Sequence, residues 1–275
     1  MAIIQLSDIH LDATYGGKFP TMVHLDKVIQ DIRKKRTEEL LKEDVIIITG
    51  DICDSGDKYY YDLVFDMLHN AFPYTPVFVT PGNHDDRGIL EEIAGAREEM
   101  NKTLGFEFES HGRITLNGSY AVSFNYRHNK VLIIDSGHMA KDGSQHFLMI
   151  TRYEYLKEVM DDSLLFTHIP PFQVPHRFMQ QDGYCMKHPN SMTSLIRNAK
   201  AVFCGHYHYA HVQREDDFDL SGIPASVDQY VCPAVQCQLD PYSAECSPSG
   251  IFPGYNLIHV GKDTGNVMVE TRLLY

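Results

Sequence analysis

Short apolar runs recur along this chain, and polar residues follow each run at once. Five of these runs are predicted to be buried strands, at residues 3–6, 45–48, 77–79, 164–166 and 201–203. A helix with one buried face is indicated between the first two runs by the i, i+3, i+4, i+7 spacing of Leu25, Val28, Ile29 and Ile32. The same spacing predicts a helix over about 60–71, and helical stretches are also expected at about 151–161 and 191–199.

Strands that alternate with helices are typical of βαβ units, so we expect the five strands to build a largely parallel, buried sheet. The pattern changes to closely spaced strands around 106–135 and 255–274, which indicates a second sheet of mixed or antiparallel type. No repeat, linker or low-complexity tract interrupts the chain. We therefore interpret residues 1–275 as a single α/β domain.

Charge and cysteine usage limit the possible partners and location. The 275 residues include 24 Lys and Arg against 37 Asp and Glu, which gives a net charge of −13. This balance disfavours a nucleic-acid partner, because such proteins neutralise phosphates with a basic face. No apolar run exceeds four residues, so no membrane span is expected. The six cysteines form no C-x-x-C pair and no signal peptide is visible, so we expect a soluble, cytoplasmic protein with reduced thiols.

Polar residues suited to metal binding follow the five predicted strands. The segments are Asp8-Ile9-His10, Gly50-Asp51, Gly82-Asn83-His84-Asp85, Thr167-His168 and Gly205-His206-Tyr207-His208. All of them fall at carboxyl ends of strands, where open α/β sheets bind their ligands. We expect Asp8-Ile9-His10 to be extended, so that Asp8 and His10 face the same side and Ile9 the other, and His206 and His208 repeat this spacing. The glycine in three of the segments permits a sharp turn and close backbone approach.

Seven side chains in these segments carry oxygen or nitrogen donors, namely Asp8, His10, Asp51, Asn83, His168, His206 and His208. Such donors without thiolates suit Mn, Fe, Zn or Co. Seven exceed what one tetrahedral ion uses, whereas two ions bridged by Asp51 would use them all. Two metals about 3.5–4 Å apart are the usual clamp for in-line attack on phosphorus. We therefore expect two divalent or trivalent transition-metal ions and a small anionic phosphate ester as substrate.

In this order, the same residues resemble the signature of the calcineurin-like metallophosphoesterase superfamily, Asp-x-His, Gly-Asp, Gly-Asn-His-Asp/Glu, His and Gly-His-x-His, over essentially the whole chain. The resemblance implies a four-layer αββα sandwich of two mixed β-sheets flanked by helices. It implies that one metal is held by Asp8, His10, Asp51 and His208, and the other by Asp51, Asn83, His168 and His206. We expect the segment of about 222–275 to complete the second sheet and part of the rim of the site.

Further segments look like the class III cyclic-nucleotide phosphodiesterases and the related glycerophosphodiesterases, at residues 82–87, 132–136, 233–240 and 253–255. This resemblance implies a phosphodiesterase that acts on a small diester, with 3′,5′-cyclic AMP as the first candidate. Residues 169–190 depart from the bacterial cyclic-AMP enzymes, so a glycerophosphodiesterase or a phosphomonoesterase is the alternative.

Individual roles follow from this hypothesis, in which a hydroxide bridging the two ions attacks phosphorus. His84 is expected to stabilise the transition state or to protonate the leaving alkoxide. Asp85 is expected to orient His84 or a ligand histidine, with a turn-capping carboxylate as the alternative. Asn83, His84 and Arg87 are expected to contact the substrate.

Two further interpretations concern the role of the loop at 169–190 and the other functions, nuclease or scaffold, that proteins with the same signature have. A wall for a base or an alcohol group is expected from Phe172, His176, Arg177, Phe178 and Tyr184, with ordinary loop packing as the alternative. The acidic charge disfavours a nuclease, and the complete ligand set disfavours a non-catalytic scaffold. Because relatives in the superfamily are commonly dimers or larger, a homodimer is one option for this chain.

Overall fold

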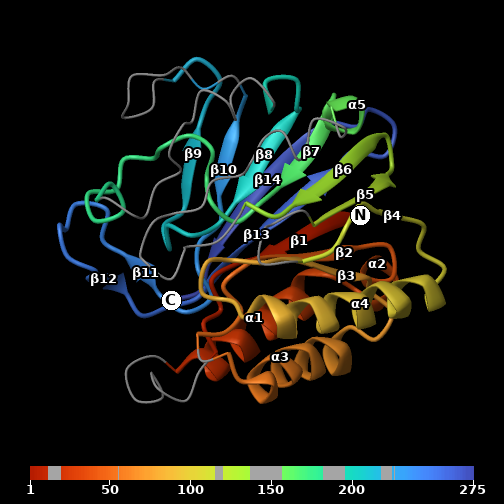
Figure 1. The fold of residues 1–275 in the computed structure, drawn as a ribbon, viewed down its shortest axis with the longest axis horizontal. Helices are drawn as coiled ribbons and strands as arrows, with labels where there is room; N and C mark the ends of the chain where they lie inside the picture. Colours follow the sequence, from red (N-terminus) through yellow and green to blue (C-terminus); the bar gives the residue numbers. More distant parts are fainter. Residues whose placement is uncertain are drawn as a thin grey trace.

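The computed structural model describes residues 1–11, 20–54, 56–114, 120–136, 157–181, 196–217, 225 and 227–275. Two β-sheets are stacked, and three long helices lie against one side of the stack (Figure 1). Among the described residues, no helix combines the length and the apolar character that a bilayer span needs.

The first sheet has five strands in the order β14-β13-β1-β2-β3. Its three parallel strands are β1 (Ala2–Leu6), β2 (Val45–Thr49) and β3 (Val77–Thr80). Two further strands extend it antiparallel beyond β1, first β13 (Gly254–Val260) and then β14 (Val267–Leu273). Every residue of β1, β2 and β3 is buried, as expected for parallel strands covered on both faces.

The second sheet has seven strands in the order β4-β5-β6-β7-β8-β10-β9. Their bounds are β4 (Glu109–Ser110), β5 (Ala121–Tyr126), β6 (Asn129–Ile134), β7 (Ser163–Phe166), β8 (Ala201–Cys204), β9 (His211–Gln213) and β10 (Gln229–Val231). The strands β6, β7, β8 and β10 are parallel to their neighbours in that run, whereas β4, β5 and β9 pair antiparallel. A separate two-stranded ribbon joins β11 (Gln238–Leu239) and β12 (Pro248–Gly250).

The helices on the five-stranded sheet are α1 (Thr21–Lys35), α3 (Lys58–Ala71) and α4 (Arg87–Thr103) (Figure 1). Carboxylates cap two of them, because Asp57 accepts from Tyr59 N in α3 and Asp86 accepts from Ile89 N in α4. Two short helices complete the set, α2 (Glu38–Leu41) and α5 (Lys157–Met160), and α5 packs on β6 and β7.

Side chains of the second sheet alternate between two hydrophobic clusters. Ile133 and Phe166 belong to the large cluster shared with the first sheet and its helices. Leu132 and Leu165 face the other way and pack with Met160 of α5. Because side chains alternate along a strand, one apolar face of the second sheet packs against the first sheet, and the other packs against α5 and the rest of the smaller cluster.

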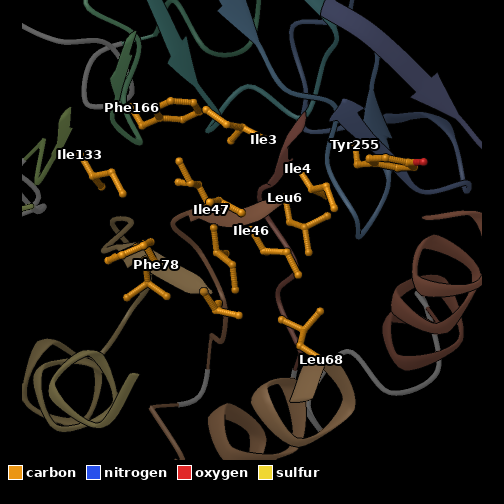
Figure 2. Close-up of a cluster of buried hydrophobic side chains, with 14 of the residues drawn as sticks. Ile3, Ile4, Leu6, Ile46, Ile47, Leu68, Phe78, Ile133, Phe166 and Tyr255 are labelled. Carbon is orange, nitrogen blue, oxygen red and sulfur yellow. The ribbon is translucent and has the colours of Figure 1, made fainter. Parts of the chain in front are cut away.

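The large cluster runs through the middle of the molecule, and Figure 2 shows its members from Phe166 in one sheet to Ile3 in the other. It continues to Leu68 of α3, so the same core holds both sheets and the helical layer together.

All five predicted strands are present, as β1, β2, β3, β7 and β8. They do not form one parallel sheet, however, because β7 and β8 belong to the second sheet. The 255–274 segment also differs from the expectation, since it extends the sheet of β1 rather than joining the strands at 106–135. An apolar pattern indicates which face of a strand is buried, but it does not indicate which other strand pairs with it in the sheet.

The predicted helices at 25–32 and 60–71 are α1 and α3. The helix expected at about 151–161 is confirmed in its described part by α5, whereas residues 151–156 lie outside the described residues. Residues 191–195 of the helix expected at about 191–199 also lie outside them. The sequence pattern does not predict α4, whose buried apolar positions are few and whose helix contains Gly88 and Gly95.

Candidate metal centre

The carboxyl ends of the parallel strands of both sheets meet at one edge of the sandwich. Bonds between the sheets mark this edge, because Gln5 Nε2 donates to Cys204 O at 3.1 Å and Thr80 Oγ1 donates to Ile134 O at 2.8 Å. The loops that follow β1, β2, β3, β7 and β8 therefore come together, and they carry all seven predicted metal ligands.

Five of these seven residues have a left-handed backbone, with φ of +53° at Asp8, +47° at His10, +53° at Asp51, +72° at His206 and +49° at His208. The expectation of an extended Asp8-Ile9-His10 segment is therefore wrong, and a left-handed turn at each ligand directs the donors instead. Residues other than glycine adopt this backbone at a cost of about 1–3 kcal/mol each. Such strain gathered in one place is typical of functional sites.

Group one consists of Asp8, His10 and His208, whose donor atoms all lie within 4.8 Å of one another. His208 Nε2 lies 3.0 Å from His10 Nε2 and 3.4 Å from Asp8 Oδ1. The three side chains are buried, and within the described part of the chain His208 Nδ1 has no hydrogen-bond partner. Two ring nitrogens and a carboxylate thus converge on one point.

Group two consists of Asp51, His168 and His206, which meet the same 4.8 Å criterion. His168 Nε2 lies 3.3 Å from Asp51 Oδ2 and 3.0 Å from Asn83 Oδ1. His168 Nδ1 donates to Thr49 O at 2.7 Å, so the lone pair of Nε2 points toward the group. Asn83 therefore joins group two through its carbonyl oxygen.

Asp51 faces both groups with the same oxygen atom. Its Oδ2 lies 3.5 Å from His10 Nε2 in group one and 3.3 Å from His168 Nε2 in group two. Its Oδ1 accepts from His84 N at 2.9 Å. A Cβ at Gly82 would lie 2.0 Å from Asp51 Oδ1, so the close approach expected at this glycine is confirmed.

The pKa shifts of the buried donors go in both directions, toward the neutral form at Asp8 and His208 and toward the charged form at His168. Against the effect of burial, the charge of Asp51 raises the pKa of His168 to about 9. Burial raises the pKa of Asp8 to about 6, which reflects the cost of placing this carboxylate in the interior without a cation. Burial and the neighbouring His10 lower the pKa of His208 well below its usual value, so its ring is neutral, as a metal ligand must be. The donor set fits a pair of transition-metal ions.

His84 lies beside group one, with its ring centroid 5.0 Å from that of His10. Its side chain is 48% exposed, unlike the buried ligand histidines. The charge of Asp51 raises the pKa of His84 to about 10 against the effect of burial, and a hydrogen bond to Asp54 adds to the rise. His84 therefore stands between the buried donors and solvent.

Asp54 is a residue of the site that the sequence reasoning missed. Its Oδ1 lies 2.5 Å from His10 Nδ1 and 3.0 Å from His84 Nδ1, so one carboxylate orients both rings. Burial opposes the ionisation of Asp54, but these two histidines lower its pKa well below the usual value. A carboxylate three residues after Asp51 in the same loop is the signal that could have identified it.

Asp85 anchors the backbone between two ligand loops. Its Oδ2 accepts from Asp51 N and Gly82 N, both at 2.9 Å. Its Oδ1 accepts from Ile52 N at 2.9 Å and from the Tyr61 hydroxyl at 3.0 Å. The structure thus gives Asp85 the contacts of a capping carboxylate that holds the Asp51 loop against the Asn83 loop.

Arg87 is buried rather than open to a ligand, with a side chain that is 4% exposed. Its guanidinium forms a bidentate ion pair with Asp135, in which Nη2 donates to Oδ1 at 2.8 Å and Nη1 donates to Oδ2. The structure therefore brings Asn83 and His84 to the centre, and it directs Arg87 toward the end of β6.

The C-terminal part of the chain forms one side of group one. Gln236 N donates to Asp8 O at 3.0 Å, and Leu239 N donates to His208 O at 2.8 Å. Val235 N bonds the residue before Asp8 in the same way, at 3.0 Å from Ser7 O. These backbone bonds fix the loops on which two ligands stand.

The loop after His168 differs from the expected substrate wall in two side chains. Phe172 is fully buried in the outer cluster of the second sheet, and His176 is 1% exposed and packs edge-on against Tyr207 and Tyr209. Ordinary loop packing thus describes both, because burial of their apolar surface against neighbouring side chains is favourable. Phe178 is half-buried and Arg177 is exposed, and Tyr184 lies outside the described residues.

Known protein families match this arrangement. A family model described as Calcineurin-like phosphoesterase matches residues 1–210, which include every candidate ligand. A solved structure, a dimetal phosphatase from Danio rerio, aligns with a TM-score of 0.60 at 14% identity and covers 99% of this chain and 98% of that one. This likeness shows the fold, a sandwich of mixed sheets with helices.

Curated relatives extend the match over the C-terminal part. A probable cyclic nucleotide phosphodiesterase from Fibrobacter succinogenes is 23% identical over 286 residues, covering 100% of this chain and 94% of the relative. A probable glycerophosphodiester phosphodiesterase GpdQ from Arcobacter nitrofigilis is 24% identical over 213 residues, covering 76% and 72% respectively.

Proposed function

Since this chain belongs to the calcineurin-like phosphoesterase family, we propose that it is a dinuclear metal-dependent phosphodiesterase that hydrolyses a small phosphodiester, with 3′,5′-cyclic AMP as the first candidate. The family uses a dinuclear metal centre, and two relatives are named as phosphodiesterases. The observation that carries the proposal is the position of Asp51 Oδ2, which faces His10 Nε2 at 3.5 Å and His168 Nε2 at 3.3 Å.

In this proposal Asp51 would serve both ions. One ion would be held by Asp51 with Asp8, His10 and His208, and the other by Asp51 with Asn83, His168 and His206. The donors suit Mn, Fe, Zn or Co. When bound, such a pair supplies positive charge at the phosphate and lowers the pKa of a water molecule.

The chain's own residues then handle the substrate and the leaving group. His84 donates a proton from Nε2 to the departing alkoxide, because its Nδ1 is held by Asp54 at 3.0 Å. Asn83 and His84 contact the phosphate, since they stand where the ligand loops open to solvent. Asp85 acts through the backbone bonds that keep Asp51 and Asn83 in place.

The charge of the protein and the state of its cysteines bear on its substrate and its location. A small anionic diester suits a centre whose cations outweigh two buried carboxylates, whereas the net charge of −13 opposes a long polyanion such as DNA. The thiols of Cys204, Cys232 and Cys237 are buried and form no disulfide in the described part of the chain, which suits a cytoplasmic enzyme.

A glycerophosphodiester is the second candidate substrate, favoured by the relative named GpdQ. A phosphomonoester is the third, because the same pair of ions would serve either ester.

A substrate panel tests the proposal on protein stripped of metal and reconstituted with Mn²⁺. The panel compares kcat/KM for 3′,5′-cyclic AMP, 2′,3′-cyclic nucleotides, a glycerophosphodiester, a nitrophenyl phosphodiester and its monoester. We expect diesters to be preferred, with 3′,5′-cyclic AMP ahead. A preference for the monoester would overturn the diesterase assignment, and a preference for the glycerophosphodiester would replace the first candidate by the second.

A further inference from the structure

The end of β6 contacts the segments on both sides of group two. We call the three consecutive residues there, Ile134, Asp135 and Ser136, the β6 junction. On one side, Thr80 Oγ1 at the end of β3 donates to Ile134 O at 2.8 Å. On the other side, the backbone N–H of Ile169, the residue after His168, donates to Ser136 Oγ at 3.0 Å. The β6 junction thus lies between the first sheet and a ligand loop of the second.

Asp135, the middle residue of the β6 junction, forms an ion pair with Arg87, the first residue of α4. Both oxygen atoms of the Asp135 carboxylate accept from the Arg87 guanidinium. The side chain of Asp135 is 0% exposed and that of Arg87 is 4% exposed. An arginine paired in this way does not present its charge to a substrate. The backbone to which it is attached gives it a route to the site.

That backbone is the loop of Asn83. Arg87 directly follows residues 82–86, and Asn83 Oδ1 in this loop lies 3.0 Å from His168 Nε2. The β6 junction is therefore bonded to one side of this contact through Arg87 and to the other side through Ile169. Both members of the contact depend on the same short segment.

We propose that Arg87 and Asp135 are positioning residues that set the separation of Asn83 and His168, and so control the filling of group two. This inference rests on the proposed function, because it requires that group two binds an ion. Group one has further supports of its own, since Asp54 contacts His10 and the backbone of residues 235–239 holds the loops of Asp8 and His208.

Electron paramagnetic resonance during a Mn²⁺ titration tests this assignment. Two Mn²⁺ ions that share Asp51 are exchange-coupled, whereas a single bound Mn²⁺ gives an uncoupled signal. In Asp135→Asn, we expect one uncoupled Mn²⁺ per chain, with the coupled signal appearing only at about 10–100-fold higher Mn²⁺ than in the unchanged protein. Arg87→Lys and Ser136→Ala should shift the coupled signal in the same direction by a smaller factor.

The chain offers a matched control in a second buried ion pair. Arg36 donates to Asp44 through Nε at 2.7 Å and Nη2 at 2.6 Å, and these side chains are 8% and 0% exposed. Asp44 directly precedes β2, at the amino end of the strands and away from the ligand loops. Asp44→Asn should therefore lower the melting temperature and leave the coupled signal at its original Mn²⁺ concentration.

The outcomes separate the two hypotheses. If the unchanged protein never shows a coupled Mn²⁺ pair, the proposed function fails. If it does, the positioning role is overturned when Asp135→Asn keeps the original coupled signal, when it loses both ions together, or when Asp44→Asn has the same effect. Arg87→Lys decides the question if Asp135→Asn does not fold, because it keeps a cation at this position but cannot form the bidentate pair.

Discussion

Groups one and two contain similar donors but are held in place by different parts of the chain. The loops of group one are fixed by backbone bonds from the C-terminal segment, in which Gln236 N bonds Asp8 O and Leu239 N bonds His208 O. Group two is fixed by Thr49 O on His168 and by side chains at the end of β6. The two sites can therefore be perturbed separately, although they share Asp51.

The same difference appears along the sequence. The family model ends at residue 210 and includes all the candidate ligands, but the segment that fixes group one lies beyond it at 235–239. In group two, the described supports of His168 and Asn83 lie within residues 49–169, whereas His206 N donates to the Asp8 carboxylate. Changes in the C-terminal segment should consequently affect the environment of group one first.

The largest effect is expected from replacing Asp51, the residue that faces both groups. Asp51→Ala should abolish metal binding at both, because Asp51 Oδ2 faces a histidine of each. Elemental analysis after Mn²⁺ loading and gel filtration should find no bound metal, and activity should fall to that of the metal-free protein. Asp26→Ala, at an exposed position of α1, is the control. Retention of one full equivalent of Mn²⁺ would show that Asp51 is no bridge.

Single-ligand variants should separate the groups. His10→Ala should retain the ion of group two, and His168→Ala should retain that of group one, because each removes a nitrogen from one group only. At Mn²⁺ 100 times above the dissociation constant, each ion stabilises the fold by about 2.7 kcal/mol. The rise in melting temperature on adding Mn²⁺ should thus be about halved in either variant. A complete loss of this rise in both would mean that the ions bind only as a pair.

His84→Ala should affect chemistry without affecting either group. The side chain is half exposed and its Nδ1 contacts Asp54, which belongs to neither group one nor group two, so the ions of both groups should stay bound. Without a proton donor, kcat should fall by about 10²–10⁴-fold for a substrate with a poor leaving group. A nitrophenyl leaving group needs no proton, so its hydrolysis should fall less. Equal losses on both substrates would remove His84 from the protonation step.

Asp54→Asn should give the smallest of these effects and should concern group one alone. Asp54 orients His10 as well as His84, so the amide should weaken the ion of group one by about 10–100-fold. Isothermal titration with Mn²⁺ measures both affinities. Asp62→Asn, at an exposed residue that pairs with Lys58 on the surface of α3, should change neither. A larger loss at group two than at group one would contradict the contacts of Asp54.

Much of this centre could be predicted from the amino-acid sequence, because its chemistry lies in short local segments. Five apolar runs predicted five strands, and the polar residues behind them carried the donors that the fold collects into two groups. The resemblance to calcineurin-like metallophosphoesterases is confirmed by the family model. Local order along the chain was sufficient here because a strand delivers the residues that follow it to the edge of its sheet.

Other features depended on partners distant in sequence. Arg87 was expected at the substrate but lies against Asp135, 48 positions away. Phe172 and His176 were expected to face the cleft but lie in cores, and Asp54 was missed because its two histidine partners lie 44 and 30 residues from it. The sequence gives the charge or the aromatic character of such a side chain, but it does not give the residue that this side chain contacts in the folded protein.

The sequence by itself determined the strands, the donor chemistry and the family, since each rests on residues that are close neighbours in the chain. Only the tertiary structure decided how the strands divide between two sheets, which turns are left-handed and which contacts support each ion. These features depend on the packing of segments far apart in the chain, as in the bond from Asn256 Nδ2 to Gln5 Oε1, 251 positions away. The free energy of such packing is a property of the assembled core.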